Sequence, residues 1–485
     1  MENMIKRFFY FLGIIFVFAV SGCNNENIER PGSFGSLDNS LSNPERINKF
    51  IIDGVRTYYL WESETDWSKY DDREKLAVYS DHGKLFENFV HKDDHWSSLT
   101  DDINGLTEQV DNVSKTFGYY LRIYRNPFTM NNEAIAVVLY TVPGSPAADK
   151  GLKRGDIIVE VNGGKITLDN YNVLVNASSL TLKCGVLNNE SKTITVLPET
   201  KAITAVKMYK DPVSAYKVIE EKGHKIGYLC YTGYQEKSEN DLVRIFSEFK
   251  SAGVSYVVLD LRYNTGGYAR TAKMLSSILV PKSVVDSKGV YLEHYYNNLY
   301  AAYLKDRGGE LNEHFVDTLP VNMDLKHLYI LTGKNTASAS EATIVGLKPY
   351  LNVTLIGDTT AGKYCGGILL SPSALYGEKY ESYYSGFSNW GMYIMVYRFA
   401  NINGISSFTG GIIPDIPANE GSFDLKPFGD KNDPLLGRAL AHILNEEYIE
   451  TRSSGEMFEP FISLPDMKSP VDGMLDSSKK IIVCK

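Results

Sequence analysis

The spacing of apolar residues divides the chain into three regions of different character. After Asn43-Pro44, which reads as an N-cap followed by proline at the first helical position, apolar residues from Ile47 to Tyr59 recur at helical spacing. A second helical pattern runs through about residues 76–90. These patterns predict a small helical domain that ends near Ser114.

The next region has the composition typical of strands. Strand-like segments lie at 115–124, 133–141, 156–162 and 192–197, with glycine and proline between them. We therefore expect a β-domain up to about residue 201.

Beyond Lys201 the period changes repeatedly between that of a strand and that of a helix. This alternation predicts βαβ units and a largely buried sheet with helical crossovers, interrupted by a polar, tyrosine-rich insertion at about 286–320. Strands are expected at 225–231, 254–262, 326–333 and 352–357, and helices at about 239–252, 269–279, 338–348 and 434–444.

The first residues have the character of a targeting segment. Lys6 and Arg7 precede thirteen apolar residues, too few to span a hydrocarbon core but typical of a signal peptide. The run ends in Val20-Ser21-Gly22-Cys23, which resembles the bacterial lipobox. That resemblance implies a lipoprotein that begins at an acylated Cys23 and lies in the bacterial cell envelope, in the outer membrane, facing either the periplasm or the outside. The alternative is an uncleaved anchor with an incidental cysteine.

The whole chain then reads as a multi-domain α/β protein. Its expected parts are a signal peptide (1–22), a polar tether (23–43), an N-terminal helical domain (44–113), a β-domain (114–201), an α/β domain (202–450) and a C-terminal tail without a clear pattern (451–485).

Composition narrows the function by exclusion. With 43% hydrophobic and 22% charged residues the chain has ordinary globular usage. Its 50 basic and 59 acidic residues give a net charge of −9 without any basic block, which disfavours nucleic acid as a partner. The five cysteines show no CxxC spacing. His91 and His95 have i, i+4 spacing, but the residues between them read as a turn, so no metal site is expected.

The β-domain contains a recognisable set of turns. Pro143-Gly144-Ser145-Pro146-Ala147-Ala148, followed by Gly151-Leu152 and Arg154-Gly155-Asp156, resembles the PDZ domains of bacterial proteases. In such domains a peptide adds a strand to a sheet edge, and backbone N–H groups hold its terminal carboxylate. The resemblance implies that Phe117, Gly118, Tyr119 and Tyr120 bind the tail of a protein partner. The alternative is a plain hairpin with aromatic core residues.

Four ordered motifs in the α/β domain resemble the C-terminal processing (tail-specific) peptidase family. They are Asp260-Leu261-Arg262-Tyr263-Asn264-Thr265-Gly266-Gly267, Thr336-Ala337-Ser338-Ala339-Ser340-Glu341, Gly357-Asp358-Thr359-Thr360-Ala361-Gly362-Lys363 and Gly411-Ile412-Ile413-Pro414-Asp415. The resemblance implies a crotonase-like core in which Ser338 attacks the scissile carbonyl and Lys363 is its general base, without a cofactor.

The same motifs suggest an oxyanion hole. Ser338 is predicted to open a helix, so the amide of Ala339 can face a developing negative charge, and a second donor would come from Gly266 or Gly267. Many family members have a third glycine where Thr265 stands, which leaves the choice between the two glycines open.

Each motif also has a plainer interpretation. Ser338 to Glu341 forms a capping box, and residues 357–363 fit the first positions of a P-loop, although Tyr364 replaces the residue that would hold magnesium. Ser247-Glu248-Phe249-Lys250 matches SxxK but reads as a helix face.

One position departs from the family. Gly367 stands where many members carry a glutamine that orients the lysine. Two hypotheses therefore remain: a lipid-anchored serine endopeptidase that captures C-terminal tails, and a catalytically silent binding lipoprotein of the same fold.

Overall fold

The computed structural model describes residues 37–70, 72–129, 131–406, 408–449, 460–464 and 474–475. The predicted signal peptide and Cys23 lie outside this part of the chain.

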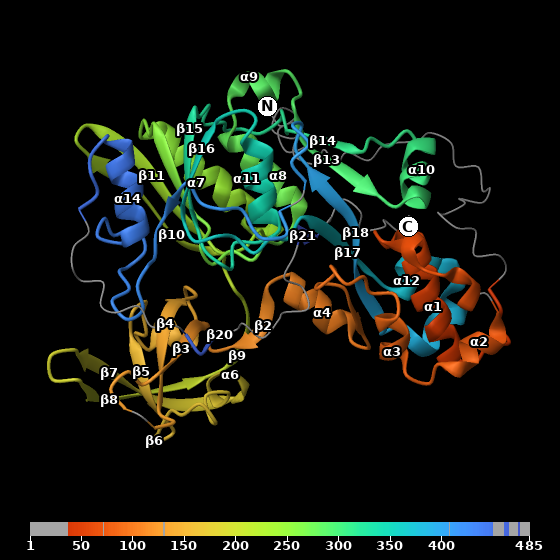
Figure 1. Cartoon of the computed structure of the whole chain (residues 1–485), viewed down its shortest axis with the longest axis horizontal. Helices are drawn as coiled ribbons and strands as arrows, with labels where there is room; N and C mark the ends of the chain where they lie inside the picture. The colour runs from red at the N-terminus through yellow and green to blue at the C-terminus, as the bar shows by residue number, and fades with distance from the viewer. Residues whose placement is uncertain are drawn as a thin grey trace, which may run out of the picture.

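A six-stranded sheet is the central sheet of the α/β domain, in the order β10-β11-β12-β15-β16-β19 (upper left in Figure 1). The pair β10–β11 is antiparallel, and every later pair in the sheet is parallel. Its inner strands are runs of valine, isoleucine, leucine and tyrosine buried on both faces, as parallel sheets require. The strands are β10 (Val213–Glu221), β11 (His224–Tyr231), β12 (Tyr256–Asp260), β15 (His327–Thr332), β16 (Asn352–Gly357) and β19 (Ile416–Pro417).

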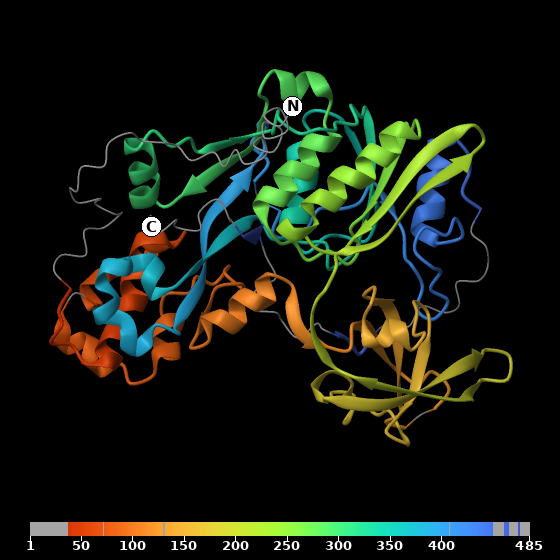
Figure 2. The same cartoon turned by 180° about the vertical axis from the view of Figure 1, so that it is seen from behind.

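Helices cover both faces of this sheet (Figures 1 and 2). Three of them pack their apolar sides into one core with the sheet, and the fourth packs on the opposite face, against residues such as Tyr228 and Leu331. The first three are α7 (Glu239–Ser251), α8 (Ala269–Leu279) and α11 (Ala339–Leu347), and the fourth is α14 (Pro434–Ile443). The βαβ pattern predicted from the sequence is therefore confirmed.

A second sheet, in the order β14-β13-β18-β17-β21 with β1 against β18, extends the core towards the N-terminal helices. The tyrosine-rich insertion supplies part of it, since residues 286–320 contain β13, β14 and a helix. Its elements are β1 (Ser98–Thr100), β13 (Val290–Tyr296), α10 (Asn298–Asp306), β14 (Asn312–His314), β17 (Cys365–Leu370), β18 (Gly391–Ala400) and β21 (Met474–Leu475).

The N-terminal helices share one hydrophobic core with this region. Helix α1 is capped by Ser42 rather than Asn43, because the Glu45 carboxylate accepts both the N–H and the hydroxyl of Ser42. The helix expected at 76–90 is two short helices, since Asp81 caps the second by accepting the Lys84 N–H. The helices of this region are α1 (Asn43–Tyr58), α2 (Arg73–Val78), α3 (His82–Glu87), α4 (Ile103–Val110), α12 (Pro372–Tyr376) and α13 (Glu381–Tyr384), whereas α9 (Lys282–Asp286) follows α8 in the α/β domain.

The β-domain is a separate unit with its own core, below the central sheet in Figure 1. Its strands follow the order β20-β3-β4-β5-β7-β8, with β6 against β5, and the antiparallel pair β2–β9 joins it to the rest of the chain. Its elements are β2 (Val113–Thr116), β3 (Tyr119–Arg125), β4 (Ala134–Thr141), α5 (Pro146–Asp149), β5 (Ile157–Val161), β6 (Gly164–Lys165), α6 (Val173–Asn176), β7 (Ser179–Asn188), β8 (Thr193–Thr204), β9 (Val206–Tyr209) and β20 (Ile462–Leu464).

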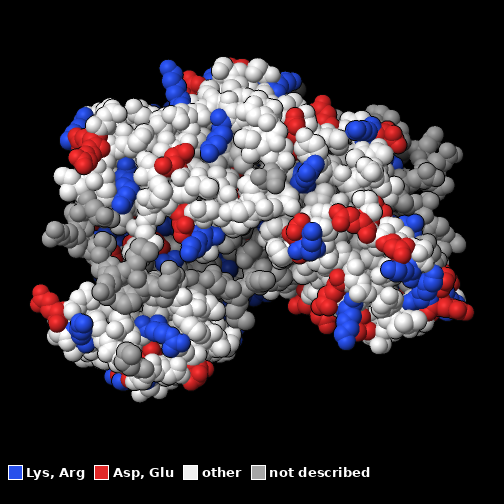
Figure 3. All heavy atoms as spheres, in the orientation of Figure 1, with Lys and Arg blue, Asp and Glu red and all other residues white. Residues whose placement is uncertain are grey.

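On the face drawn in Figure 3, basic and acidic side chains are interspersed rather than gathered by sign. Among the described residues, no helix has both the length and the apolar character needed to cross a bilayer.

Candidate active site

Ser338 stands at the first turn of α11, immediately after a loop that leaves β15. Its backbone has φ +58°, a conformation that a side chain rarely adopts and that costs roughly 1–3 kcal/mol. The residue is fully buried, and its Oγ has no hydrogen-bond partner within the described part of the chain. An unpaired buried hydroxyl in a strained backbone is typical of a functional residue rather than of a helix cap.

Lys363 lies in the loop between β16 and β17, and only 1% of its surface is exposed. Its Nζ stands over two aromatic rings, 5.1 Å from the centroid of Trp96 and 5.4 Å from that of Tyr393. Tyr393 belongs to β18, whereas Trp96 comes from the N-terminal region. Cation–π contacts of this kind hold an ammonium group in place without neutralising it.

The turn that carries Trp96 is itself fixed by a buried carboxylate. Asp94 accepts hydrogen bonds from the N–H groups of Trp96 and Ser97, both at 2.9 Å, and from the hydroxyl of Tyr59 at 2.7 Å. The Ser97 hydroxyl in turn accepts the Met395 N–H at 3.0 Å. The N-terminal region therefore forms one wall of the lysine site.

Glu341 joins the serine to the lysine. One of its carboxylate oxygens, Oε2, accepts the backbone N–H of Ser338 and that of Lys363, each at 2.8 Å. The other oxygen accepts the Gly362 N–H at 2.7 Å and the Thr360 hydroxyl. The main chains of the two residues thus lie side by side on a single buried acid.

Burial sets the protonation of this acid. Desolvation raises the pKa of Glu341 from 4.5 to about 7, although hydrogen bonds from Thr360, Ser338, Gly362 and Lys363 act in the opposite direction. The negative charge of Glu341 is thus present only when the pH is near or above neutrality.

The glycine turn after β12 packs directly against the serine. Gly266 has φ +114° and Gly267 has φ +133°. A Cβ on Gly266 would lie 2.9 Å from the Ser338 Cβ and 3.3 Å from the Ala339 nitrogen, so no other residue fits. The Gly266 N–H donates to the Asn264 side chain at 2.9 Å. Within the described residues, the amides of Gly267 and Ala339 donate to no acceptor and remain available to a ligand.

The predicted peptide-binding residues divide between two faces of the β-domain. Phe117 and Tyr119 are buried in its core, and the Tyr119 hydroxyl donates to the Leu174 carbonyl. Gly118 has φ +80° and lies between them. Tyr120 points to the other face, where it stacks on Tyr140 with ring centroids 4.2 Å apart. Its ring therefore lies in the seam with the α/β domain rather than beside the predicted groove.

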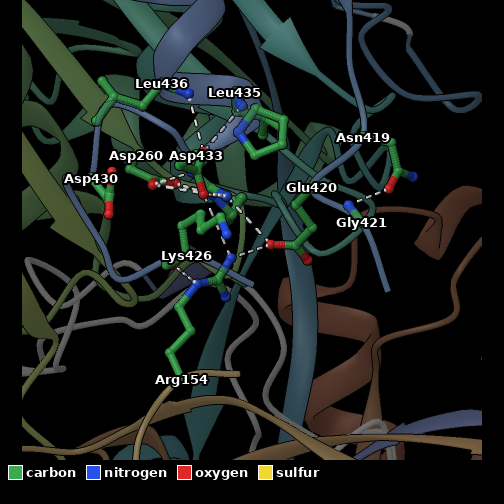
Figure 4. Close-up of polar contacts among 12 residues, drawn as sticks. Arg154, Asp260, Asn419, Glu420, Gly421, Lys426, Asp430, Asp433, Leu435 and Leu436 are labelled. Atoms are coloured by element: carbon green, nitrogen blue, oxygen red, sulfur yellow. Dashed lines mark hydrogen bonds and ion pairs between the residues drawn. The ribbon is translucent and has the colours of Figure 1, made fainter. Parts of the chain in front are cut away.

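A buried charge network crosses that seam, and Figure 4 shows part of it. Arg154 of the β-domain donates to Glu420 and to the Tyr263 hydroxyl, both at 2.7 Å. Arg262, which precedes the glycine turn, donates twice to Asp433 at 2.9 Å and three times to Asp260, at 2.8, 2.9 and 3.1 Å. Burial opposes ionisation of Glu420, but the guanidinium groups around it lower its pKa well below the usual range. The network fixes the β-domain against the segment that leads to Gly266.

Sequence patterns missed three of these residues. Trp96 and Tyr393 carry no motif that points to a lysine, and Glu341 reads as half of a capping box, which it is. Within the described part of the chain, the Ser338 Oγ itself has no hydrogen-bond partner.

The alternative motifs have structural explanations. Residues 357–363 lead into the strand β17, whereas a phosphate loop would lead into a helix. Ser247 lies on α7 and donates to the Val243 carbonyl. His91 stacks on Trp61 and contacts Glu64. Among the described residues, no three His, Cys, Asp or Glu side chains are grouped to hold a metal ion.

Comparison with known proteins agrees with this arrangement. Residues 225–418 match the model of peptidase family S41, and residues 137–177 match that of the PDZ domain. The carboxyl-terminal-processing protease of a Picosynechococcus species is 23% identical over 230 residues, which cover 47% of this chain and 50% of that protein. The carboxy-terminal processing protease CtpB of Bacillus subtilis is 26% identical over 230 residues, which cover 45% of this chain and 42% of that protein. The chain thus spans about half the length of the curated relatives it matches.

A solved structure extends the similarity. A crystal structure assigned to an S41 protease of Bacteroides fragilis has a TM-score of 0.67 and 26% identity, covering 81% of this chain and 97% of that one. The fold defines a class, that of multi-domain α/β proteins with a PDZ domain, which this chain shares with the S41 protease structure. Residues 225–418 are similar to peptidase family S41, and about half of the chain is similar to C-terminal processing proteases.

Proposed function

We propose that the protein is a serine endopeptidase with a catalytic dyad of Ser338 and Lys363. The observation that carries this proposal is the buried Ser338 hydroxyl, which has no hydrogen-bond partner among the described residues. The backbone N–H groups of Ser338 and Lys363 donate to the same Glu341 carboxylate. A buried lysine can act as a base for a neighbouring serine once it is neutral.

The reaction would proceed in two halves. The Ser338 Oγ attacks the scissile carbonyl carbon while the Lys363 Nζ takes its proton, and the amides of Ala339 and Gly267 stabilise the oxyanion. The intermediate collapses, the ammonium group of Lys363 gives a proton to the leaving amine, and an ester on Ser338 remains. A water molecule, deprotonated by Lys363, then attacks the ester, and Lys363 returns the proton to the Ser338 Oγ as the acid is released.

Substrate capture belongs to the same proposal. The PDZ domain would bind the C-terminal tails of protein substrates along β3, with the loop at Phe117 and Gly118 near the terminal carboxylate. Attachment to the envelope through a lipid on Cys23, and a crotonase-like ancestry of the core, complete it. In place of the absent glutamine at Gly367, the rings of Trp96 and Tyr393 would orient Lys363.

The test replaces the nucleophile and its neighbour in parallel. Ser338→Ala should abolish cleavage of an unfolded reporter protein and labelling by a fluorophosphonate, whereas the circular dichroism spectrum stays unchanged. Ser340→Ala is the matched control, because the Ser340 hydroxyl already donates to the Asn264 carbonyl at 3.1 Å. Lys363→Ala should equal Ser338→Ala in severity.

Two outcomes would refute the proposal. Cleavage that persists in Ser338→Ala would place the nucleophile elsewhere. Absence of both labelling and cleavage in the wild-type protein would favour the catalytically silent binding lipoprotein.

A further inference from the structure

A segment of the same chain pairs with the outer edge of the PDZ strand β3. Residues 462–464 form β20, which pairs antiparallel with β3 in the register Ile462 with Ile123 and Leu464 with Leu121. The Phe461 N–H also donates to the Ile123 carbonyl at 2.7 Å. Strand addition to an open edge is how peptides bind to domains of this kind.

Two side chains of this segment contact the PDZ domain. The Phe461 ring lies 5.7 Å from that of Tyr171, edge to face, and the Arg125 guanidinium lies 5.9 Å from its centroid. Ile462 packs against the core of the PDZ domain. The segment therefore makes both the main-chain and the side-chain contacts of a bound peptide.

The direction of the segment is that of a captured tail. As the numbering rises from 462 to 464, the paired residue on β3 falls from 123 to 121, towards the loop at Phe117 and Gly118. A C-terminal tail must run the same way if its carboxylate is to reach the backbone N–H groups of that loop.

The same end of the chain also covers an edge beside the active site. Met474 and Leu475 form β21, which pairs parallel with Gly366 and Gly367 of β17. Strand β17 begins two residues after Lys363, and β21 is the last strand of this sheet. Figure 1 shows β20 at the PDZ domain and β21 at β17. An incoming strand could not add to either edge while these segments are in place.

We propose that residues 460–464 are an internal ligand of the PDZ groove and that, together with residues 474–475, they hold the protein in a self-occupied state that a substrate tail must displace. This inference rests on the proposed function of the groove. Intramolecular segments act at millimolar effective concentrations, so an internal ligand of about 0.1 mM affinity would weaken an external one roughly tenfold.

The experiment measures binding of an external copy of the same segment. The probe is a fluorescein-labelled peptide of residues 457–464 with a free carboxylate at Leu464, titrated into the full chain carrying Ser338→Ala and followed by fluorescence polarisation. Ile462→Asp, which places a charge against the PDZ core, should tighten probe binding about tenfold. Ile449→Asp is the matched control, since Ile449 is 80% exposed, and should leave the affinity unchanged.

Phe461→Ala provides a milder second variant should Ile462→Asp fold poorly, and it should also tighten binding. Equal affinity for the probe in the parent and both variants would overturn the inference. So would failure of the probe to bind any of them, because a groove freed of its ligand must accept the same sequence. Neither result bears on catalysis, which is measured separately by fluorophosphonate labelling of the active chain.

Discussion

Replacing Glu341 by glutamine tests whether one buried acid holds the two residues of the proposed dyad together. The side chain is fully buried and accepts four donors, two on each oxygen. Glutamine has one oxygen and one NH₂ group. Its NH₂ group would therefore face at least one of the donors that the second carboxylate oxygen accepts in the wild-type protein. A buried donor left without an acceptor costs about 1–3 kcal/mol. We therefore expect kcat to fall in Glu341→Gln at pH 8, where Glu341 is mostly ionised.

The pH dependence of stability gives a sharper signature. In the folded protein the pKa of Glu341 is about 7, compared with 4.5 for a glutamate exposed to solvent, because burial disfavours the charged form. A raised carboxyl pKa stabilises the fold below pH 4.5, and this stabilisation is lost as the pH rises through 7. Between pH 5 and pH 8 the unfolding free energy of the wild-type protein should fall by about 2–3 kcal/mol more than that of the glutamine variant.

The assay is urea unfolding of both proteins at pH 5 and pH 8, with Glu248→Gln as a control whose side chain is half exposed and pairs with Arg244. Groups common to both proteins cancel in the difference. A difference in unfolding free energy that stays constant between the two pH values would refute the assignment of a buried, late-ionising acid.

Two further predictions concern the surroundings of the dyad. Trp96→Leu keeps an apolar side chain but removes the π face 5.1 Å from the Lys363 Nζ. Loss of a contact worth about 0.5–2 kcal/mol should lower kcat about 2- to 30-fold. The control is His95→Ala, an exposed neighbour, which should leave kcat unchanged. An unchanged kcat in Trp96→Leu would show that the ring does not position the lysine. Asp433→Asn removes the charge that Arg262 contacts twice and should lower the unfolding free energy by about 3–5 kcal/mol in urea titrations. The exposed pair of Asp424 with Lys426 is the comparison, and loss of less than about 1 kcal/mol is expected for Asp424→Asn; equal losses in the two variants would contradict the role of burial.

Local patterns predicted the α/β core well because each of its elements carries its own signal. The helix expected at 338–348 is α11 at 339–347, and the strand expected at 225–231 is β11 at 224–231. The split of residues 76–90 into two helices depends on the Asp81 cap, a single polar contact that apolar spacing does not register.

Contacts between distant segments were beyond such patterns. The pairing of β20 with β3 and the position of Trp96 over Lys363 depend on how whole layers pack. The residue pattern of β20 or of the Trp96 turn does not indicate which distant segment it contacts. The role of Glu341 was hidden for a different reason. A capping box and a shared acid need the same residue at the same place, and only the unpaired Ser338 hydroxyl distinguishes them.

The contribution of the N-terminal region to the lysine site has a consequence for the order of synthesis. The Ser97 hydroxyl accepts the N–H of Met395, a residue 298 positions further along the chain. A chain made from its N-terminus therefore exposes the Trp96 turn long before β18 exists to receive it. Since the wall over Lys363 closes only when both are present, a growing chain cannot assemble this site before β18 has been made.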